Sequence, residues 1–180
     1  DMNGSTTDDA ECTPCLLGKH KNLEDATPCV DCALGMYADS TGLSNCTDCP
    51  RGYYSSETSQ SSCQSCSVGT QNNLIKQTSP TACTVCKYGR FASQNNTEEC
   101  TKCAKGKFLA DDSQNVDKHD EANDCSECPD TYYSPVEGQQ ECTQCNDVIY
   151  TKTSCGEAGS SCNPGSYIES SNNFSCTPCI

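Results

Sequence analysis

Hydrophobic and polar positions along the chain show neither a long apolar run nor a helical period. Apolar residues stand singly between polar segments such as SSETSQSS, ASQNNTEE and VEGQQE. Segments of this composition form turns and short strands more readily than helices. The sequence therefore predicts little regular secondary structure, most of it short β-hairpins.

Cysteine pairs are the repeated feature of the chain. Two cysteines separated by two residues, C-x-x-C, start at positions 12, 29, 46, 63, 83, 100, 125, 142 and 176. Most starts are 17 residues apart, and Cys155 with Cys162 forms a displaced tenth pair in which Gly159 stands where a cysteine is expected. A fixed period is typical of tandem arrays in which each repeat contacts its neighbours.

A turn motif, C-x-x-G-x-aromatic, follows most of these pairs. It occurs as CALGMY, CPRGYY, CKYGRF, CAKGKF and CNPGSY. Glycine at this place predicts a tight turn with positive φ or a close backbone approach, and the aromatic ring can then cover a disulfide or the next repeat. His20 and Gln71 replace the aromatic residue, and Thr131 and Val148 replace glycine, so glycine is favoured but not required.

Composition shows what must hold such a chain together. Only 20 of its 180 residues are Leu, Ile, Val or Phe, whereas 20 are Cys. Because so few apolar side chains cannot offset the entropy lost on folding, covalent cross-links must replace the missing core. The net charge of −14 argues against nucleic acid, whose phosphates need Lys and Arg. No segment approaches the roughly 18 apolar residues of a membrane span, so a membrane anchor is expected only outside this chain.

Three chemistries could use the C-x-x-C pairs. Four-thiolate zinc sites have similar spacing, but here glycine stands two residues too late for a zinc knuckle and one pair is displaced. A redox C-x-x-C needs a helix start in a βαβ setting, which the sequence does not supply. Structural disulfides in an oxidising compartment are the favoured interpretation, zinc is the alternative, and no cofactor is predicted.

Loop lengths favour one disulfide pairing over another. Taken two at a time, the pairs form five units whose inner loops all have 13 residues, while the loops between units have 13, 16, 21 and 9. Constant spacing inside each unit favours bridges from first to third and from second to fourth cysteine. These bridges are Cys12–Cys29, Cys15–Cys32, Cys46–Cys63, Cys49–Cys66, Cys83–Cys100, Cys86–Cys103, Cys125–Cys142, Cys128–Cys145, Cys155–Cys176 and Cys162–Cys179. The alternative joins neighbouring pairs, from Cys15–Cys29 to Cys162–Cys176, and leaves Cys12 and Cys179 free or bonded to further repeats.

The same grouping predicts the domain organisation. A polar N-terminal segment (1–11) is followed by cysteine-rich units at 12–45, 46–82, 83–124, 125–154 and 155–180, the last of them divergent. The expected fold is a small, disulfide-rich, elongated tandem array with little regular secondary structure beyond short β-hairpins.

Four N-x-[ST] sequons are candidate sites for N-linked glycans in a secreted protein, at Asn3, Asn45, Asn95 and Asn173. Asn95 lies in a polar loop and is expected to be accessible, and so is Asn3 in the polar terminus. Asn45 is also expected to be reachable, although Asn95 is the better site, because Cys46 directly after Asn45 can oxidise early and bury the acceptor; Asn173, three residues before Cys176, is expected to be hindered in the same way.

Candidate catalytic or metal-binding residues outside the cysteines are few. His20 and His119 are the only histidines. Neither belongs to a nucleophile or metalloprotease motif, both are expected to face solvent, and no enzyme activity is predicted. Six carboxylates gather in one insertion, at Asp111, Asp112, Asp117, Asp120, Glu121 and Asp124. A solvated acidic loop is predicted there, with calcium as the alternative because hard oxygen ligands cluster.

C-x-x-C-x-x-G-x-[FY], a polar loop and a further C-x-x-C together resemble the ephrin-receptor-like cysteine-rich repeat, which is itself similar to modules of tumour-necrosis-factor receptors. The resemblance covers about Cys12 to Cys179. The long array in a Ser/Thr/Asn/Gln-rich chain also resembles the surface immobilisation antigens of ciliates, and the density of C-x-x-C is similar to that of variant surface proteins of diplomonad parasites. The resemblance implies an elongated extracellular or cell-surface rod without catalysis.

Two functions follow from these expectations. The near-equivalence of the repeats favours an extracellular structural or surface-coat protein: a spacer, coat or filament component that assembles with itself or with other extracellular proteins. The alternative is the ligand-binding ectodomain of a cysteine-rich receptor, which would need aromatic or Arg anchors in one unit. Arg occurs only at positions 51 and 90, and Trp is absent, which favours the coat.

Overall fold

The computed structural model describes residues 13–21, 28–111 and 113–145, together with the strands within 150–155, 166–168 and 176–178. Several sequence predictions fall outside these residues. They concern Cys12 and the Asn3 and Asn173 sequons, the turn at Val148, Asp112, and the side chains of the last two cysteine pairs.

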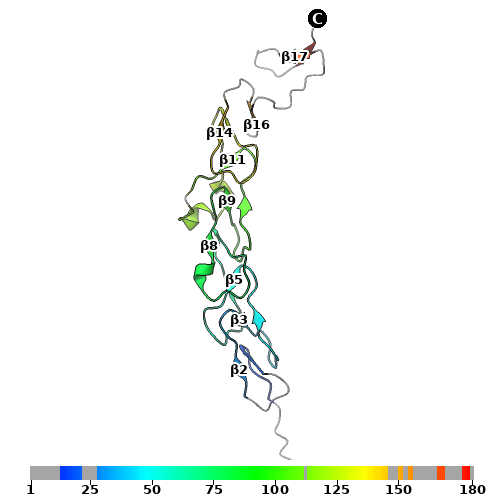
Figure 1. Cartoon of the computed structure of the whole chain (residues 1–180), viewed down its shortest axis with the longest axis vertical. Helices are drawn as coiled ribbons and strands as arrows, with labels where there is room; N and C mark the ends of the chain where they lie inside the picture. Colours follow the sequence, from blue (N-terminus) through cyan, green and yellow to red (C-terminus); the bar gives the residue numbers. More distant parts are fainter. Residues whose placement is uncertain are drawn as a thin grey trace, which may run out of the picture. The chain divides into compact units, whose positions relative to one another are not determined.

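The described chain is built from antiparallel two-stranded ribbons, each strand two or three residues long. The pairs are β1 (Lys19–His20) with β2 (Val30–Asp31), β3 (Met36–Tyr37) with β4 (Thr47–Asp48), β5 (Tyr53–Tyr54) with β6 (Gln64–Ser65), β7 (Thr70–Gln71) with β8 (Thr84–Val85), β9 (Arg90–Phe91) with β10 (Thr101–Lys102), β11 (Lys107–Phe108) with β12 (Ser126–Glu127), β13 (Tyr132–Tyr133) with β14 (Thr143–Gln144), β15 (Tyr150–Thr151) with β16 (Ser154–Cys155), and β17 (Ser166–Ile168) with β18 (Cys176–Pro178). Figure 1 shows the strands as short arrows joined by longer loops.

The repeat motif supplies both strands of a ribbon. The first strand comes directly after the glycine turn and contains the aromatic position, as in Met36–Tyr37 after Gly35. The second strand is the pair of residues enclosed by the next C-x-x-C, as in Thr47–Asp48 between Cys46 and Cys49. The predicted small disulfide-rich, repeated fold with short β-hairpins is confirmed.

Short 3-10 helices take up the extra residues of the two longest loops. The first, η1 (Pro80–Ala82), lies in the loop before Cys83, with Ser79 Oγ accepting a hydrogen bond from Thr81 N at 3.2 Å. The loop before Cys125 holds η2 (Val116–Lys118) and η3 (Ala122–Asp124). The helices of the described residues have three residues each, far fewer than a membrane span needs.

The chain divides into two compact units. Unit 1 comprises the described residues up to Cys66 together with Asn72–Cys83, and unit 2 comprises Ser67–Gln71 and the described residues from Thr84 onward. The five units expected from cysteine grouping stay a prediction, although the bridges Cys32–Cys46 and Cys66–Cys83 each cross one of the expected boundaries.

Six of the described repeats have a small core made of the disulfide and one further buried side chain, whereas Lys21, at the corresponding place after Cys15, is only half-buried. The buried side chain stands six residues after the second cysteine of the pair, at Ala38, Ser55, Asn72, Ala92, Leu109 and Ser134. The polar members are satisfied internally: Ser55 Oγ donates to Glu57 O at 3.1 Å and Ser134 Oγ to Val136 O at 3.0 Å. In unit 2, Phe91 packs against the cluster of Cys103, Leu109 and Cys125, as expected for an aromatic ring that covers the next disulfide.

Candidate functional site

Disulfides join the second cysteine of each pair to the first cysteine of the next pair. The seven bridges in the described residues are Cys15–Cys29, Cys32–Cys46, Cys49–Cys63, Cys66–Cys83, Cys86–Cys100, Cys103–Cys125 and Cys128–Cys142. Cys145 is also disulfide-bonded. The favoured pairing of first to third and second to fourth cysteine, such as Cys15–Cys32, is therefore wrong over these residues, and the alternative that joins neighbouring pairs is the one observed.

Strand geometry explains why the favoured pairing fails. The two cysteines of a C-x-x-C flank a two-residue strand, as Cys46 and Cys49 flank β4. Side chains three positions apart along extended backbone point to opposite sides. One cysteine therefore faces the loop before the strand and the other faces the loop after it, so the two cannot both reach the same neighbouring pair.

The argument from loop length failed because the insertions lie inside closed loops. Five of the seven bridges have a sequence separation of 14, whereas Cys66–Cys83 has 17 and Cys103–Cys125 has 22. The added residues fold as 3-10 turns just before the closing cysteine. Lengthening a surface loop costs little entropy, so a variable length does not mark a linker between units.

Backbone hydrogen bonds connect each glycine turn to the next repeat. Gly35 N donates to Ser55 O at 2.9 Å, and Cys49 N donates to Gly35 O at 2.8 Å. The equivalent two bonds occur at Gly18 and Gly52 in unit 1 and at Gly69, Gly89 and Gly106 in unit 2. In most of these repeats a third bond follows, in which the residue six places after the second cysteine donates its N–H to the next loop, as Ala38 N does to Gln60 O at 3.0 Å. We call this repeated pattern of backbone bonds the backbone ladder. It uses main-chain atoms only, which is why the side chains between repeats can vary.

Glycine is needed in the turns for two separate reasons. Gly35 has φ +75°, and a Cβ built on it would lie 2.5 Å from the Lys76 carbonyl oxygen, from a loop two repeats later. Positive φ and lack of space therefore both exclude a side chain there. Thr131 keeps the same turn with φ +67°, so the turn tolerates a β-branched residue at one repeat in spite of the backbone strain.

A cross-strand ion pair begins the first ribbon of unit 1. Lys19 Nζ donates a hydrogen bond to Asp31 Oδ1, and the two residues stand directly opposite each other in the β1–β2 register. The Lys19 hydrogen bond, with a smaller contribution from Ser59, holds the pKa of the exposed Asp31 carboxyl below its usual value. A lowered pKa stabilises the fold above the unfolded-state value and loses that effect as the pH falls through the folded-state pKa.

The two histidines do not both face solvent as predicted. His20 is half-buried, and its Nδ1 lies 3.2 Å from Cys46 Sγ. His119 is fully buried, so the expectation for His119 is wrong. The backbone carbonyl of His119 accepts a hydrogen bond from Ala92 N, just as the carbonyl of Gln139 accepts one from Leu109 N. The backbone ladder therefore fixes where His119 lies, and the lengthened loop around it covers the imidazole ring.

Contacts of the His119 ring define its hydrogen-bonding state. Nδ1 lies 2.7 Å from Arg90 O, and because a carbonyl only accepts, Nδ1 carries a proton and donates it. Nε2 has no hydrogen-bond partner among the described residues and lies 3.9 Å from Asp111 Oδ2. A cleft of about 490 Å³ opens beside this pair, lined in part by Phe108, Asp111 and Lys118.

Carboxylates of the insertion gather for a structural reason. Oxygens of Asp120, Glu121 and Asp124 lie within 4.8 Å of one another. Asp124 Oδ2 accepts from Glu121 N at 2.9 Å, as part of a capping box that closes η3. The capping box accounts for the closeness of Glu121 and Asp124 without an ion. Calcium in this segment stays an untested alternative.

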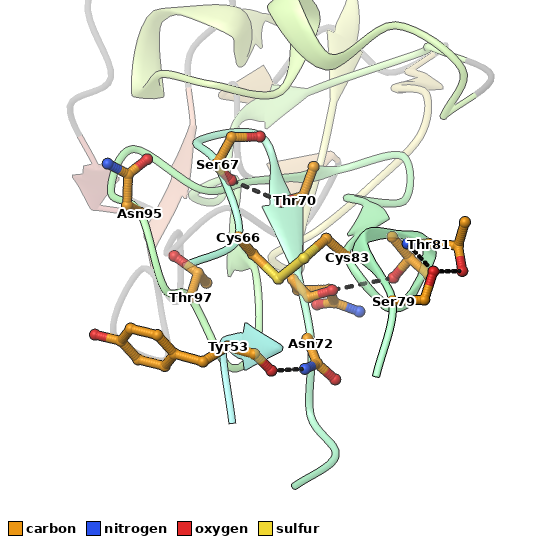
Figure 2. The surroundings of a disulfide bond; sticks show 12 residues. Tyr53, Cys66, Ser67, Thr70, Asn72, Ser79, Thr81, Cys83, Asn95 and Thr97 are labelled. Carbon is orange, nitrogen blue, oxygen red and sulfur yellow. Dashed lines mark hydrogen bonds between the residues drawn. A yellow bond between two sulfur atoms is a disulfide. The ribbon is translucent and has the colours of Figure 1, made fainter. Parts of the chain in front are cut away.

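Two of the four sequons lie in the described residues, and their asparagines are both exposed. Asn95 Oδ1 accepts a hydrogen bond from Val68 N at 3.1 Å, while Asn45 directly precedes the disulfide-bonded Cys46. Figure 2 shows Asn95 and Thr97 of the sequon, with Thr70 hydrogen-bonded to Ser67. Glycosylation at all four sites stays a prediction.

Sequence reasoning missed the buried position six residues after the second cysteine. Its occupants are small or polar in five of six repeats, so no hydrophobic pattern marks it. Aligning the repeats on their cysteines would have shown a column of mostly small residues, with Lys21 of the first described repeat as the charged exception. Asn72 in this column donates through Nδ2 to Tyr53 O at 3.0 Å, beside the Cys66–Cys83 bridge (Figure 2).

Serial disulfides, short ribbons and the backbone ladder define a class: cysteine-rich, disulfide-stapled tandem repeats of the extracellular type. Residues 35–83 match the family model described as tyrosine-protein kinase ephrin type A/B receptor-like. The predicted resemblance to ephrin-receptor-like repeats is therefore confirmed, and with the disulfides it indicates an extracellular or cell-surface location. No curated protein matches the chain. The likeness to ciliate antigens stays a prediction.

Proposed function

We propose that this chain is an extracellular structural or surface-coat segment, a disulfide-stapled spacer whose repeats are interchangeable. The backbone ladder carries this proposal. Because it recurs at six successive glycine turns with main-chain atoms alone, the described repeats that carry these turns are connected in the same way, and their connections set none of these six apart. Partners are further copies of the chain or other extracellular proteins, and N-linked glycans at the exposed asparagines.

A ligand-binding ectodomain is the second candidate. Two observations favour it: the matched family model is receptor-like, and unit 2 has a cleft of about 490 Å³ whose lining includes Phe108, Asp111, Lys118 and Asp124. A site of this kind would make one repeat different in function from the others. We propose no catalytic activity for either candidate, because the buried His119 is partnered by a backbone carbonyl and His20 by a disulfide sulfur.

Deleting whole repeats separates the two candidates. Removal of residues 33–49 from unit 1, or of 87–103 from unit 2, joins one C-x-x-C to the next turn and keeps the cysteine pattern. A spacer should shorten by the same amount in both variants. Small-angle scattering measures the radius of gyration. For the intact chain we expect a value well above the roughly 16 Å of a compact domain of this length, and for the two variants an equal decrease from it.

The control deletion, residues 33–45, removes one loop and keeps every cysteine, so it should misfold and scramble its disulfides. A radius of gyration near 16 Å for the intact chain would overturn the spacer. A soluble extracellular ligand whose binding to the chain survives loss of residues 33–49 and is abolished by removal of residues 104–128, the repeat that lines the cleft, would establish the ectodomain instead.

A further inference from the structure

We propose that His20, Cys32 and Cys46 form a metal site that a thiol opens. Reduction of the Cys32–Cys46 bridge releases two thiolates beside an imidazole, and the three together bind a thiophilic divalent ion of the Zn²⁺ class. This proposal is independent of whether the chain is a spacer or a receptor segment.

Geometry already brings the three donor atoms together. His20 Nδ1 lies 3.2 Å from Cys46 Sγ, and the donor atoms of His20, Cys32 and Cys46 all lie within 4.8 Å of one another. Zinc holds thiolate sulfur at about 2.3 Å and imidazole nitrogen at about 2.0–2.1 Å, so its tetrahedral ligands stand roughly 3.5–3.8 Å apart. The separation of His20 Nδ1 and Cys46 Sγ is close to this spacing, and breaking the bridge frees the two sulfur atoms to separate to it.

Comparison between repeats sets this bridge apart. His20 occupies the place that Tyr37, Tyr54, Phe91, Phe108 and Tyr133 occupy in other repeats. Phe91 there packs on the cluster around the Cys103–Cys125 bridge, whereas His20 presents a nitrogen to a bridge sulfur. Among the described repeats, this is the one where the side chain over a disulfide is itself a metal ligand.

The opening step is an ordinary thiol–disulfide exchange. A small thiol attacks Cys46 Sγ, which is half-buried, because Cys32 is fully buried. Cys32 leaves as a thiolate, and a second thiol then releases Cys46, so two thiols become one external disulfide and the bridge becomes two cysteines. His20 Nδ1 lies 3.2 Å from Cys46 Sγ, and an N–H at this position can donate a hydrogen bond to the Cys46 sulfur as the second exchange releases it, which favours the thiolate and speeds exchange.

Metal binding then replaces the two thiol protons. The ion is held by two thiolates and the Nδ1 lone pair, which is the Cys2His donor set of zinc sites that keep an open fourth position. Water or an external ligand fills that position. Because the ion binds only the reduced form, it pulls the exchange toward opening.

Graded reduction of the full chain tests the order of opening. The protein is equilibrated in glutathione buffers of increasing reducing strength, alkylated and mapped by peptide mass. Cys32 and Cys46 should be alkylated before the cysteines of the other six described bridges. His20→Tyr, which restores the aromatic residue of other repeats, should remove this lead, while His119→Gln should leave it unchanged.

Cobalt serves as the spectroscopic probe of the metal site. After mild reduction, Co²⁺ should give thiolate charge-transfer and tetrahedral d–d bands, and His20→Tyr should weaken binding by at least about 10-fold, since even loss of a ligand's outer partner costs that much. Zn²⁺ should also protect Cys32 and Cys46 from alkylation in the unsubstituted chain, a readout that stands even if the variant folds poorly. Simultaneous opening of all bridges, or absence of this protection, would overturn the proposal.

Discussion

A loop of regular length in unit 1 and the longest described loop in unit 2 differ in length but make the same backbone-ladder bond. The loop closed by Cys49–Cys63 has a sequence separation of 14, and its Gln60 carbonyl accepts from Ala38 N at 3.0 Å. The loop closed by Cys103–Cys125 has a separation of 22, yet its His119 carbonyl accepts from Ala92 N at 2.8 Å. The ladder therefore keeps its register despite the inserted residues.

What the insertion changes is the side chain at the ladder position and its surroundings. Gln60 is half-buried, whereas His119 is fully buried and donates to Arg90 O. The extra residues also form η2, η3 and the cleft beside Asp111. The comparison teaches that cysteines, glycine turns and the small buried residue set the register, while loop length sets only local chemistry.

Filling the glycine turns should break the ladder in both regions alike. A Cβ on Gly35 would meet Lys76 O at 2.5 Å, and one on Gly69 would meet Val116 O, in the long loop, at 2.6 Å. Alanine at either position should cost roughly 2–5 kcal/mol, from about 1–2 for the left-handed backbone and about 1–3 for the clash. Amide exchange at Cys49 and Cys86, whose N–H groups bond to these glycines, measures the loss.

Gly42→Ala is the matched control, because Gly42 has φ +73° but its nearest neighbour would be Pro14 Cβ at 3.4 Å. It should cost only the backbone part, about 1–2 kcal/mol. If Gly69→Ala cost no more than Gly42→Ala, Val116 would be free to move away, and the long loop would not be held by the ladder.

Removing one bridge from each type of loop compares their covalent contributions. The double variants Cys86→Ser/Cys100→Ser and Cys103→Ser/Cys125→Ser should each lose about 3 kcal/mol in the loop-entropy model. The longer loop should lose only about 0.4 kcal/mol more, since the cost grows with the logarithm of loop length. Non-reducing denaturant titration followed by near-ultraviolet circular dichroism measures both, and a gap of several kcal/mol would show that the insertion has its own fold.

How much the sequence could predict follows from these particular residues. The C-x-x-G-x-aromatic motif predicted the turn at Gly35 and the strand after it, because a local motif determines local backbone. Pairing between distant cysteines depends on which way each side chain points from its strand. Cys46 and Cys49 look equivalent in the sequence, and only the strand between them places their sulfur atoms on opposite sides.

His119 shows a second limit of sequence reasoning. A histidine among acidic residues is expected to be exposed. His119 is buried because its carbonyl accepts the bond from Ala92 N, and the equivalence of this position to Gln60 and Gln139 is found only when the repeats are superposed. His20 could have been singled out earlier, because it and Gln71 are the two departures from an aromatic column in the described repeats. Its contact with Cys46 nevertheless required the correct disulfide pairing.

His119→Gln converts the long loop to the side chain found at Gln60, Gln77 and Gln139. The ladder bond from Ala92 N uses the backbone of this residue and should persist. The change loses the imidazole bond to Arg90 O and some packing, so a destabilisation of about 1 kcal/mol is expected. Thermal unfolding measures it, and a loss of several kcal/mol would mean that the buried ring, and not the ladder, holds the loop.

Thr131→Gly tests the turn itself and is expected to have the smallest effect on stability. Unlike the other substitutions, it should stabilise the fold. Thr131 has φ +67°, as its glycine counterparts do, and its carbonyl accepts from Cys145 N at 2.6 Å. Glycine should relieve about 1–2 kcal/mol of left-handed strain and lose about 0.5–1 kcal/mol in chain entropy, a net gain of about 0.5–1 kcal/mol.

The reverse change in the preceding repeat, Gly106→Thr, should destabilise. Slower exchange of the Cys145 amide would record the gain. An unchanged or faster rate would show that the threonine side chain makes compensating contacts, so that the turn in this repeat is held differently from the others.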